Sequence, residues 1–589
     1  MYVAVTGSGK AKVIQFREDT RIPRTNKKKT KVIKTLGNYE RMLAEDPDII
    51  AKLKLEAAEI TRKKKEAQAP LELKVSTEEI LQPTDVVPSY CFGHALVKQL
   101  WQDLSLDTFF IQQCGKRNGE AVEQALYYLV AHRCANPGSI RSTASDQPLY
   151  AGIHPLGLDL FYNVLNVIAD QKESLVKHLN AVFEKKAARK GPEAYYDVTT
   201  YAFESTRWGE LRMFGFSKDN KHNEVQVVMG LLLDNNGLPI TYELFPGKTM
   251  DQNTLQASVK NLQTLYQLDK ITVVADRGLN SGANLAFLCG KEHDFVISYT
   301  LKRSSESLKE LVWDQGGWTH RVDRETGEVT FRSKIISQSL KVRVPLSPET
   351  QAGQPKKPGR PRKYETQEIP VHIHLTWSPK RANKDRKDRE RMIDRLKKKL
   401  DNPSQLKANI RRGGNQFLQM ELDTEDWRID EQKIEEAGRY DGYYAVITNN
   451  LALSTDEVVA IYRGLRKIEE SFRVLKTDLR ARPVFVWNDE RIKGHFAMCF
   501  LSLCLIRYAQ YLLEKHQGIQ YSAARIMDAI REPLALVQGV FPRNIVTPTR
   551  VSHEYLALAE ILKLSALKTN MTLTQFRVST KLDLSVNLK

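Results

Sequence analysis

The 589-residue chain is poor in cysteine, and its cysteines are widely scattered. No two of them form a CxxC pair; they are Cys91, Cys114, Cys134, Cys289, Cys499 and Cys504. Disulfide frameworks and structural zinc sites both need cysteines at short, regular spacings. The sequence therefore argues against both, and it predicts a protein of a reducing, cytoplasmic compartment.

Long uncharged apolar runs are also missing. No such run reaches the roughly 18 residues that a membrane-spanning helix needs. The best candidate, FAMCFLSLCLI from Phe496 to Ile506, stops at Arg507 and predicts a buried helix. The first residues, MYVAVTGSGKAKV, lack the charged, apolar and cleavage regions of a signal peptide. We expect no membrane partner.

The GSGK stretch near the start does not complete a phosphate-binding loop. That motif needs glycine where Ala4 stands and serine or threonine where Ala11 stands. An ATP site at this position is therefore not expected.

Positive charge, in contrast, is abundant. The formal net charge is +18, from 89 Lys and Arg against 71 Asp and Glu. Such a field attracts polyanions, with nucleic acid the first candidate and an anionic membrane surface the second.

Changes in pattern divide the chain into six segments. Residues 1–86 are basic, with short strands and a helix, and residues 87–190 are mostly helical, as in a DNA-binding domain. Strands dominate 191–303, where NEVQVVMGLLLDNNGLPITYELFPG predicts a hairpin around DNNG. Residues 304–440 are predicted to form a charged, β-rich insertion. Residues 441–530 return to an α/β pattern, and 531–589 form a C-terminal region. The fold class predicted is α/β with a mixed sheet.

The stretch from Ala460 to Pro483 predicts a helix with two stripes. One stripe is apolar: Leu465, Ile468, Phe472, Leu475 and Leu479. The other is polar and falls within an arc of roughly 80° on a regular helix: Tyr462, Arg466, Glu469, Arg473 and Lys476. Two interpretations of the polar stripe stay open. It is a solvated face with intrahelical ion pairs, or a metal-binding carboxylate beside phosphate-binding cations.

Three carboxylates come from three separate predicted elements. Asp197 follows paired tyrosines in the strand-like YYDVTTYAFES, Asp276 ends the apolar strand of ITVVADRGLNS, and Glu469 belongs to the helix above. Taken singly, an Asp at a strand end is more often a turn or cap residue. Together, three acids suit hard divalent cations, and two such ions can promote an in-line phosphoryl displacement.

These blocks resemble the DDE transposases of bacterial insertion sequences, in the group with a Tyr-Arg-Glu-Lys signature. The signature is Y-x2-R-x3-E-x6-K, and Tyr462, Glu469 and Lys476 match its intervals. Leu465 stands at the signature's Arg position, with Arg466 one residue later. The resemblance, which also includes ELFPGKTMD, KRANKD and RIKGHF, runs from roughly residue 90 to 510.

The resemblance implies an RNase H-like catalytic domain interrupted by a β-rich insertion, with a helical N-terminal region. It implies Mg²⁺, with Mn²⁺ as a possible substitute, held by Asp197, Asp276 and Glu469. The chemistry implied is nicking at the element ends and attack of the freed 3′-hydroxyl on target DNA. The partners implied are the terminal inverted repeats, target DNA and a second copy of the chain in a synaptic complex. The location implied is the bacterial cytoplasm, at the nucleoid.

The resemblance also implies that the polar stripe binds DNA. Tyr462, Arg473 and Lys476 would grip backbone phosphates beside the metals, which positions DNA without reading its sequence. Arg466 lies on the polar arc, and Leu465 does not. Arg466 either replaces the signature's arginine, or the contact is missing.

Two basic segments have alternative interpretations. PGRPRK, from Pro358 to Lys363, resembles an AT-hook in which Arg360 and Arg362 would enter a narrow minor groove; the alternative is a basic linker. The helix predicted from Lys380 to Lys399 is a solvated or coiled arm, or else it binds backbone phosphates.

Two rival functions remain at this point. One is an RNase H-like nuclease that cuts DNA without joining it. The other is a non-catalytic DNA-binding protein derived from a transposase. The sequence does not decide which tryptophan would stack a flipped base: Trp318, Trp377 or Trp427.

Overall fold

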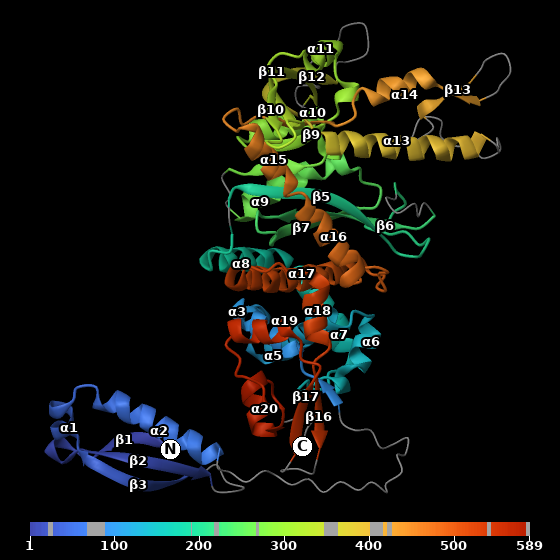
Figure 1. Cartoon of the computed structure of the whole chain (residues 1–589). Helices are drawn as coiled ribbons and strands as arrows, with labels where there is room; N and C mark the ends of the chain where they lie inside the picture. The colour runs from blue at the N-terminus through green and yellow to red at the C-terminus, as the bar shows by residue number, and fades with distance from the viewer. Residues whose placement is uncertain are drawn as a thin grey trace. The chain divides into compact units, whose positions relative to one another are not determined.

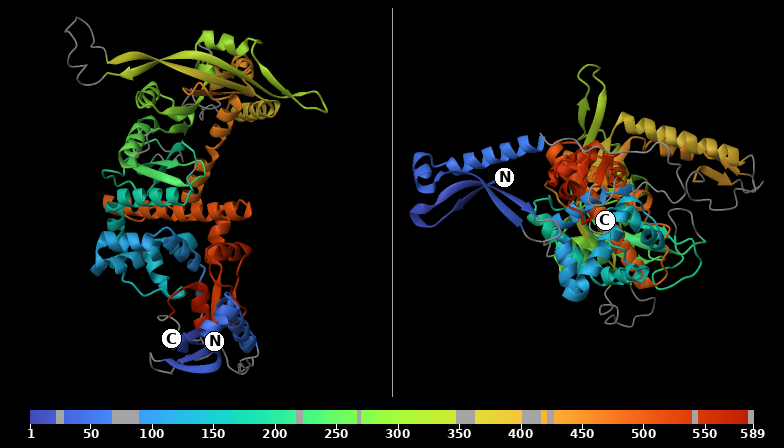
Figure 2. Two further views of the ribbon diagram at one scale, coloured as in Figure 1. Left: turned by 90° about the vertical axis from the view of Figure 1, so that its left-hand side faces the viewer. Right: turned by 90° about the horizontal axis from the view of Figure 1, so that it is seen from below.

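The computed structural model describes ten segments of the chain (Figures 1 and 2). These are residues 1–21, 28–66, 89–189, 191–216, 223–266, 270–346, 363–400, 416–420, 427–538 and 544–584. The chain divides into two compact units, Met1–Val86 and Val87–Lys589. The domain boundaries drawn from the sequence stay predictions.

The first unit packs one helix against one face of a small antiparallel sheet. Its strands are β1 (Tyr2–Thr6), β2 (Val13–Arg21) and β3 (Lys28–Asn38), followed by α1 (Tyr39–Glu45) and α2 (Ile49–Glu66). Alternate residues of β2, Ile14 and Phe16, meet Leu53 and Ala57 of α2 in the core. The period of two in a strand and the helical spacing of α2 thus produce this core.

The second unit begins with a helical layer that packs around a long apolar helix. The layer contains β4 (Ser89–Cys91), α3 (His94–Asp103), α4 (Leu106–Cys114), α5 (Lys116–Ala135), α6 (Ile140–Ser145), α7 (Leu158–Asp170) and α8 (Lys172–Lys185). The long helix is α17 (Asp489–Gln517), which contacts α5 and α7 on one side and β7 on the other. Figure 1 shows α17 running between these helices and the large sheet.

The buried helix predicted at Phe496–Ile506 is confirmed, because every residue of that run is buried within α17. Of the described helices, α17 alone is long and apolar enough to cross a membrane by length and composition. However, 89% of its most apolar window is buried inside the protein.

A large mixed sheet forms the centre of the unit. Within the described residues it has nine strands, in the order β10-β11-β12-β15-β9-β8-β5-β6-β7. Their bounds, in chain order, are β5 (Glu193–Ala202), β6 (Gln226–Leu233), β7 (Pro239–Pro246), β8 (Thr272–Ala275), β9 (Asp294–Tyr299), β10 (Thr319–Val322), β11 (Val329–Pro345), β12 (Tyr364–Trp377) and β15 (Tyr443–Thr448). β5, β6 and β7 are antiparallel neighbours, whereas β8 pairs in parallel with both β5 and β9. The predicted hairpin around DNNG is confirmed as β6 and β7.

Helices cover both faces of this sheet. One face packs on α9 (Leu255–Tyr266), α10 (Gly282–Gly290) and α11 (Glu306–Trp313). The other face packs on α15 (Thr455–Arg463), α16 (Arg466–Arg473) and α17. Because side chains alternate along a strand, Tyr195 and Tyr201 of β5 face the second group, and Tyr196 and Val198 face the first.

The β-rich segment 304–440 extends the same sheet rather than forming a separate layer. β11 and β12 pair over their length, and β12 pairs antiparallel with β15. From β12 the chain enters α13 (Pro379–Leu400), then β13 (Leu418–Met420), β14 (Trp427–Ile429) and α14 (Glu431–Gly438). Arg360 and Arg362 of the PGRPRK stretch lie outside the described residues.

The C-terminal region returns to the start of the unit. It contains α18 (Ala523–Arg531), β16 (Leu534–Gln538), β17 (Ile545–Thr549), α19 (His553–Ile561), β18 (Met571–Thr572) and α20 (Leu573–Thr580). β16 pairs with β4, so strands from both ends of this unit share one small sheet.

Candidate active site

Asp197 and Asp276 lie level with each other at the middle of the large sheet. The parallel register of β5 and β8 pairs Tyr195 with Val274. Two residues further on, Asp197 continues β5, and Asp276 follows the last residue of β8 in extended backbone. Parallel pairing thus brings together two acids that are 79 positions apart in the chain.

Both carboxylates are held by hydrogen bonds from neutral donors. The backbone N–H of Val198 donates to Asp197 Oδ1 at 2.7 Å. Asp276 Oδ1 accepts from Ser298 Oγ of β9 at 3.0 Å and from the Tyr462 hydroxyl at 3.4 Å. Tyr462 therefore links the helix pair α15 and α16 to the sheet.

The single regular helix predicted from Ala460 to Pro483 is wrong. α15 ends at Arg463, α16 begins at Arg466, and a π-helical turn, η8 (Val474–Asp478), follows. The junction at Gly464 lies directly against the ring of Tyr195, where a Cβ would collide with the hydroxyl group. The 80° arc assumes regular α-helical geometry throughout, and the structure keeps only part of it: Tyr462, Arg466 and Glu469 line one pocket, whereas Arg473 and Lys476 do not.

The apolar stripe of the same segment is confirmed. All five of its members are buried: Leu465, Ile468, Phe472, Leu475 and Leu479. They belong to the core that α16 shares with β5 and α17.

A pocket of about 1070 Å³ joins the predicted acids. Its lining includes Asp197, Asp276 and Glu469, together with Tyr462 and Arg466 of the polar stripe. Glu469 enters from α16, which packs on β5 and β6.

The other two members of the polar stripe turn elsewhere. Arg473 Nη1 lies 3.2 Å from Asp478 Oδ2, and Lys476 Nζ lies 5.5 Å from the centre of the Tyr201 ring. Neither belongs to the described lining of the pocket. Leu465, at the signature's Arg position, is only 8% exposed, and both Leu465 and Arg466 belong to the lining of the pocket.

Tyr462 is a neutral hydrogen-bond donor at this site. Its hydroxyl lies 2.7 Å from that of Tyr444, whose ring has the Arg381 guanidinium 4.3 Å above it. Burial raises the pKa of Tyr462 well above its usual value. The phenol therefore stays protonated at any pH at which the protein would work.

Sequence reasoning missed several residues of this pocket. Tyr444 gave no signal, because it is brought to the site by the pairing of β15 with β9. Ser298, which donates to Asp276 but is not part of the described lining, gave none either, because the parallel pairing of β8 with β9 sets it beside that acid. α13 contributes a set of cations to the lining: Lys380, Arg381, Lys384, Lys387 and Arg391. Their spacing of three and four residues is visible in the sequence and could have marked them as one face of a helix. The residues of the opposite wall of the pocket could not have been identified in this way.

The tryptophans considered from the sequence differ in position. Trp377 lines the pocket, and the Arg332 guanidinium lies 4.2 Å above its ring. Trp318 packs on the other side of Arg332, at 5.3 Å, and is not part of the described lining. The side chain of Trp427 lies outside the described part of the chain.

The donor set fits a hard divalent cation in its chemistry. Asp276 and Glu469 make no ion pair with any described lysine or arginine, so no cation among the described residues would compete with a metal ion for their oxygens. Oxygen ligands of this kind suit Mg²⁺. Among the described residues, however, no three His, Cys, Asp or Glu side chains are grouped closely enough to hold a metal ion. The three carboxylates would have to converge to share one.

Two part-buried hydrogen bonds to the same asparagine connect α16 to β5. Lys467 donates to the backbone oxygen of Asn235, and the Tyr195 hydroxyl donates to Asn235 Oδ1 at 3.2 Å. Asn235 belongs to the turn between β6 and β7. Through Asn235, these bonds connect Lys467 in the first turn of α16, two residues before Glu469, to Tyr195 of the strand that carries Asp197.

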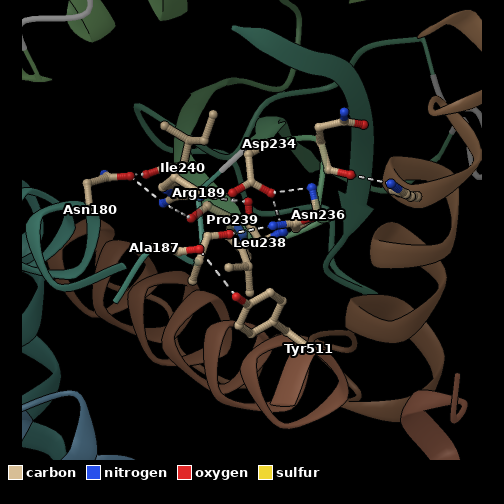
Figure 3. A network of polar contacts seen from close by, with 12 residues as sticks. Asn180, Ala187, Arg189, Asp234, Asn236, Leu238, Pro239, Ile240 and Tyr511 are labelled. Atoms are coloured by element: carbon tan, nitrogen blue, oxygen red, sulfur yellow. Dashed lines mark hydrogen bonds and ion pairs between the residues drawn. The ribbon is translucent and has the colours of Figure 1, made fainter. Parts of the chain in front are cut away.

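The same turn is held from its other side by Arg189. This guanidinium donates to Asp234 Oδ2 at 2.8 Å and to the backbone oxygens of Leu238 and Pro239 at 3.1 and 2.8 Å (Figure 3). The Asp234 side chain is 4% exposed. Burial raises its pKa even though Arg189 acts in the opposite direction.

Comparison with known proteins gives one family and one distant structure. No curated protein matches the chain. A cryo-EM structure of a piggyBac transposase synaptic complex with hairpin DNA is similar at 9% identity and a TM-score of 0.33, over 85% of this chain and 83% of that one. This score is too low to support an argument about fold or function.

The family comparison is more specific. The family described as "Transposase DDE domain" matches residues 195–505. The match covers more than half of the chain and includes Asp197, Asp276 and Glu469. The chain belongs to the DDE transposase family.

Proposed function

We propose that this protein cleaves DNA at the ends of an insertion sequence and joins the freed 3′-hydroxyl to target DNA. The observation that carries the proposal is the pocket shared by Asp197, Asp276 and Glu469. Three carboxylates from β5, the end of β8 and α16, with no lysine or arginine of the described residues paired with Asp276 or Glu469, are an arrangement suited to metal-assisted phosphoryl transfer.

We also assign an RNase H-like fold to the catalytic part. The order β7-β6-β5-β8-β9 supports this assignment, with an antiparallel meander followed by two strands added in parallel. The segment 304–440 then inserts between β9 and β15, as expected for the Tyr-Arg-Glu-Lys group of insertion-sequence transposases.

The residues have distinct roles in the proposed reaction. Asp197, Asp276 and Glu469 would hold Mg²⁺, or Mn²⁺ in its place. The bound ions would supply activation of the attacking oxygen and stabilisation of the leaving oxygen. Tyr462 positions Asp276 through its hydrogen bond. The Arg466 guanidinium supplies donors for a phosphate oxygen and takes the place of the signature's arginine.

The partners follow from the same reaction. The DNA consists of the element's terminal inverted repeats and a target, and two ends held together call for a homodimer. Contacts from Arg473 and Lys476 to DNA remain part of the proposal, although these side chains face Asp478 and Tyr201 in the free protein. The proposed location is the bacterial cytoplasm.

The test is cleavage of a linear DNA that carries the sequences flanking the gene, with Mg²⁺ present. Glu469→Gln, Asp197→Asn and Asp276→Asn should each bind the DNA as wild type does and fail to cut it. Glu435→Gln, an exposed acid on α14, is the matched control and should cut normally. If Glu469→Gln cuts as well as wild type, the assignment of Glu469 fails.

A second assay separates the rival functions. Precleaved ends are offered with a supercoiled target, and joined products are measured. Wild type that cuts but never joins is a nuclease. Wild type that binds and neither cuts nor joins is a DNA-binding protein derived from a transposase.

A further inference from the structure

α13 is fastened to the sheet by one of its faces. Asp385 Oδ2 accepts from the backbone N–H of Gly442 at 3.0 Å, and Arg389 pairs with Asp441. Further along the same face, Leu396 is buried with Phe417 and Leu418. These contacts fix the rotation of the helix about its axis.

The fixed rotation turns a row of cations toward the pocket of the three acids. Lys380, Lys384, Lys387 and Arg391 follow one another at intervals of four, three and four residues, and all of them line the pocket. At 1.5 Å per residue the row is about 16 Å long. α15 and α16 contribute the facing part of the lining, with Tyr462, Arg466 and Glu469.

The lysine side chains of this row have no polar partner among the described residues. Arg391 lies 3.5 Å from Asp388. In contrast, the side chains of Lys380, Lys384 and Lys387 make no hydrogen bond or ion pair with any other residue in the described part of the chain. Exposed ammonium groups are common on basic helices, but here three converge on a pocket whose floor carries carboxylates. Like charge gathered without partners favours an anionic ligand.

We propose that Lys380, Lys384, Lys387 and Arg391 bind the backbone phosphates of the DNA duplex that enters the pocket. This inference rests on the proposed function, because it assigns the substrate contacts of the same site. The cations neutralise consecutive phosphates on one wall while the acids lie on the floor. They hold the strand without reading its bases, because contacts to phosphates carry no sequence information.

The test uses the full chain and a fluorescently labelled duplex of random sequence, because phosphate contacts do not depend on sequence. Binding is measured by anisotropy over a series of salt concentrations. The variant is Lys380→Gln/Lys384→Gln/Lys387→Gln. The matched control, Arg386→Gln/Arg395→Gln/Lys397→Gln, removes three exposed charges from the same helix outside the described lining of the pocket. Glutamine keeps the helix propensity of lysine and arginine.

The expected result is a change in salt dependence. The slope of log K against log salt is negative, and each lost phosphate contact reduces its magnitude by about 0.9. The magnitude for the pocket variant should therefore be smaller than that of wild type by between about 2 and 3. Its affinity at low salt should fall more than tenfold, whereas the control stays within about twofold of wild type. Lys380→Arg/Lys384→Arg/Lys387→Arg should restore the slope, which a mere folding defect would not allow.

Two failures are distinguishable. If wild type binds and cleaves DNA but the pocket variant keeps the wild-type slope, or the control loses as much, this inference is overturned and the proposed function stands. If wild type does not bind the duplex, the proposed function is overturned as well. Equal thermal midpoints of the three proteins establish that each is folded.

Discussion

The backbone of Gly464 lies directly against the ring of Tyr195, so that the junction of α15 and α16 crosses the strand that carries Asp197. Any side chain at this position would collide with the Tyr195 hydroxyl and the ring carbon that bears it. The contact sets how closely Tyr462 and Glu469 approach the sheet, because they flank the junction on both sides.

Gly464→Ala should therefore separate the helices from β5. We expect a loss of about 1–3 kcal/mol in the free energy of unfolding, as for other overpacked sites, and a larger loss of DNA cleavage than of DNA binding. Gly290→Ala is the control, because a Cβ there meets nothing within 4 Å. Urea denaturation and cleavage assays measure both effects. Unchanged stability and cleavage in Gly464→Ala would show that the contact is unimportant.

Tyr462→Phe should slow cleavage at least tenfold, because Asp276 loses its donor from α15 and the Tyr444 hydroxyl loses its partner. The stability cost should be about 1–2 kcal/mol, because two hydrogen bonds are lost and each has a usual net value of about 1 kcal/mol. Because burial raises the pKa of Tyr462, its ionisation should contribute nothing to the alkaline side of the pH–rate profile. Tyr511→Phe, which removes the bond to the Ala187 oxygen and lies outside the described lining of the pocket, is the control (Figure 3). Equal cleavage rates for Tyr462→Phe and wild type would contradict the positioning role.

Arg189→Met should destabilise the protein by about 3–5 kcal/mol, because it leaves the buried Asp234 carboxylate without its cation. The loss should shrink as the pH falls, since a protonated Asp234 no longer needs the guanidinium. Arg386→Met breaks an exposed pair with Glu390 and should cost at most about 1 kcal/mol. Denaturant unfolding at two pH values measures both variants. If the loss of unfolding free energy in Arg189→Met does not change with pH, it arises from lost packing of the Arg189 side chain and not from the unpaired charge of Asp234.

Acid should destabilise the protein through buried histidines. Burial lowers the pKa of His94 and of His495 to about 3 and that of His374 to about 4. These rings are neutral in the folded chain but take up protons in the unfolded chain below about pH 6.5. The stability they contribute is fully present above about pH 6.5 and is lost progressively as the pH falls to about 4 for His374 and about 3 for His94 and His495.

The size of this effect can be isolated with one variant. Between pH 6 and pH 4.5, His94→Gln should lower the slope of unfolding free energy against pH by about 1.4 kcal/mol per unit, the equivalent of one proton. Thermal and denaturant unfolding over this range measure the slope, whatever the variant's absolute stability. A slope equal to that of wild type would mean that His94 is protonated in the folded state.

Part of the site was determined by the sequence alone. The strand before Asp276, the hairpin around DNNG, the buried run at Phe496–Ile506 and the apolar stripe of the Glu469 helix all follow from residue periodicity. Periodicity is a local property, so it survives in any fold that buries those faces. The family resemblance then rested on acids and a tyrosine at fixed spacings.

The rest was decided by tertiary structure. The level placement of Asp197 and Asp276 depends on the parallel register of β5 and β8, which is set by packing between segments far apart in the chain. Likewise, the collision that requires glycine at 464 involves Tyr195, more than 200 positions earlier. The cations of α13 face the acids only because Asp385 and Arg389 fix the rotation of that helix on the sheet. Contacts across such distances depend on the whole core, and no local pattern of residues encodes them.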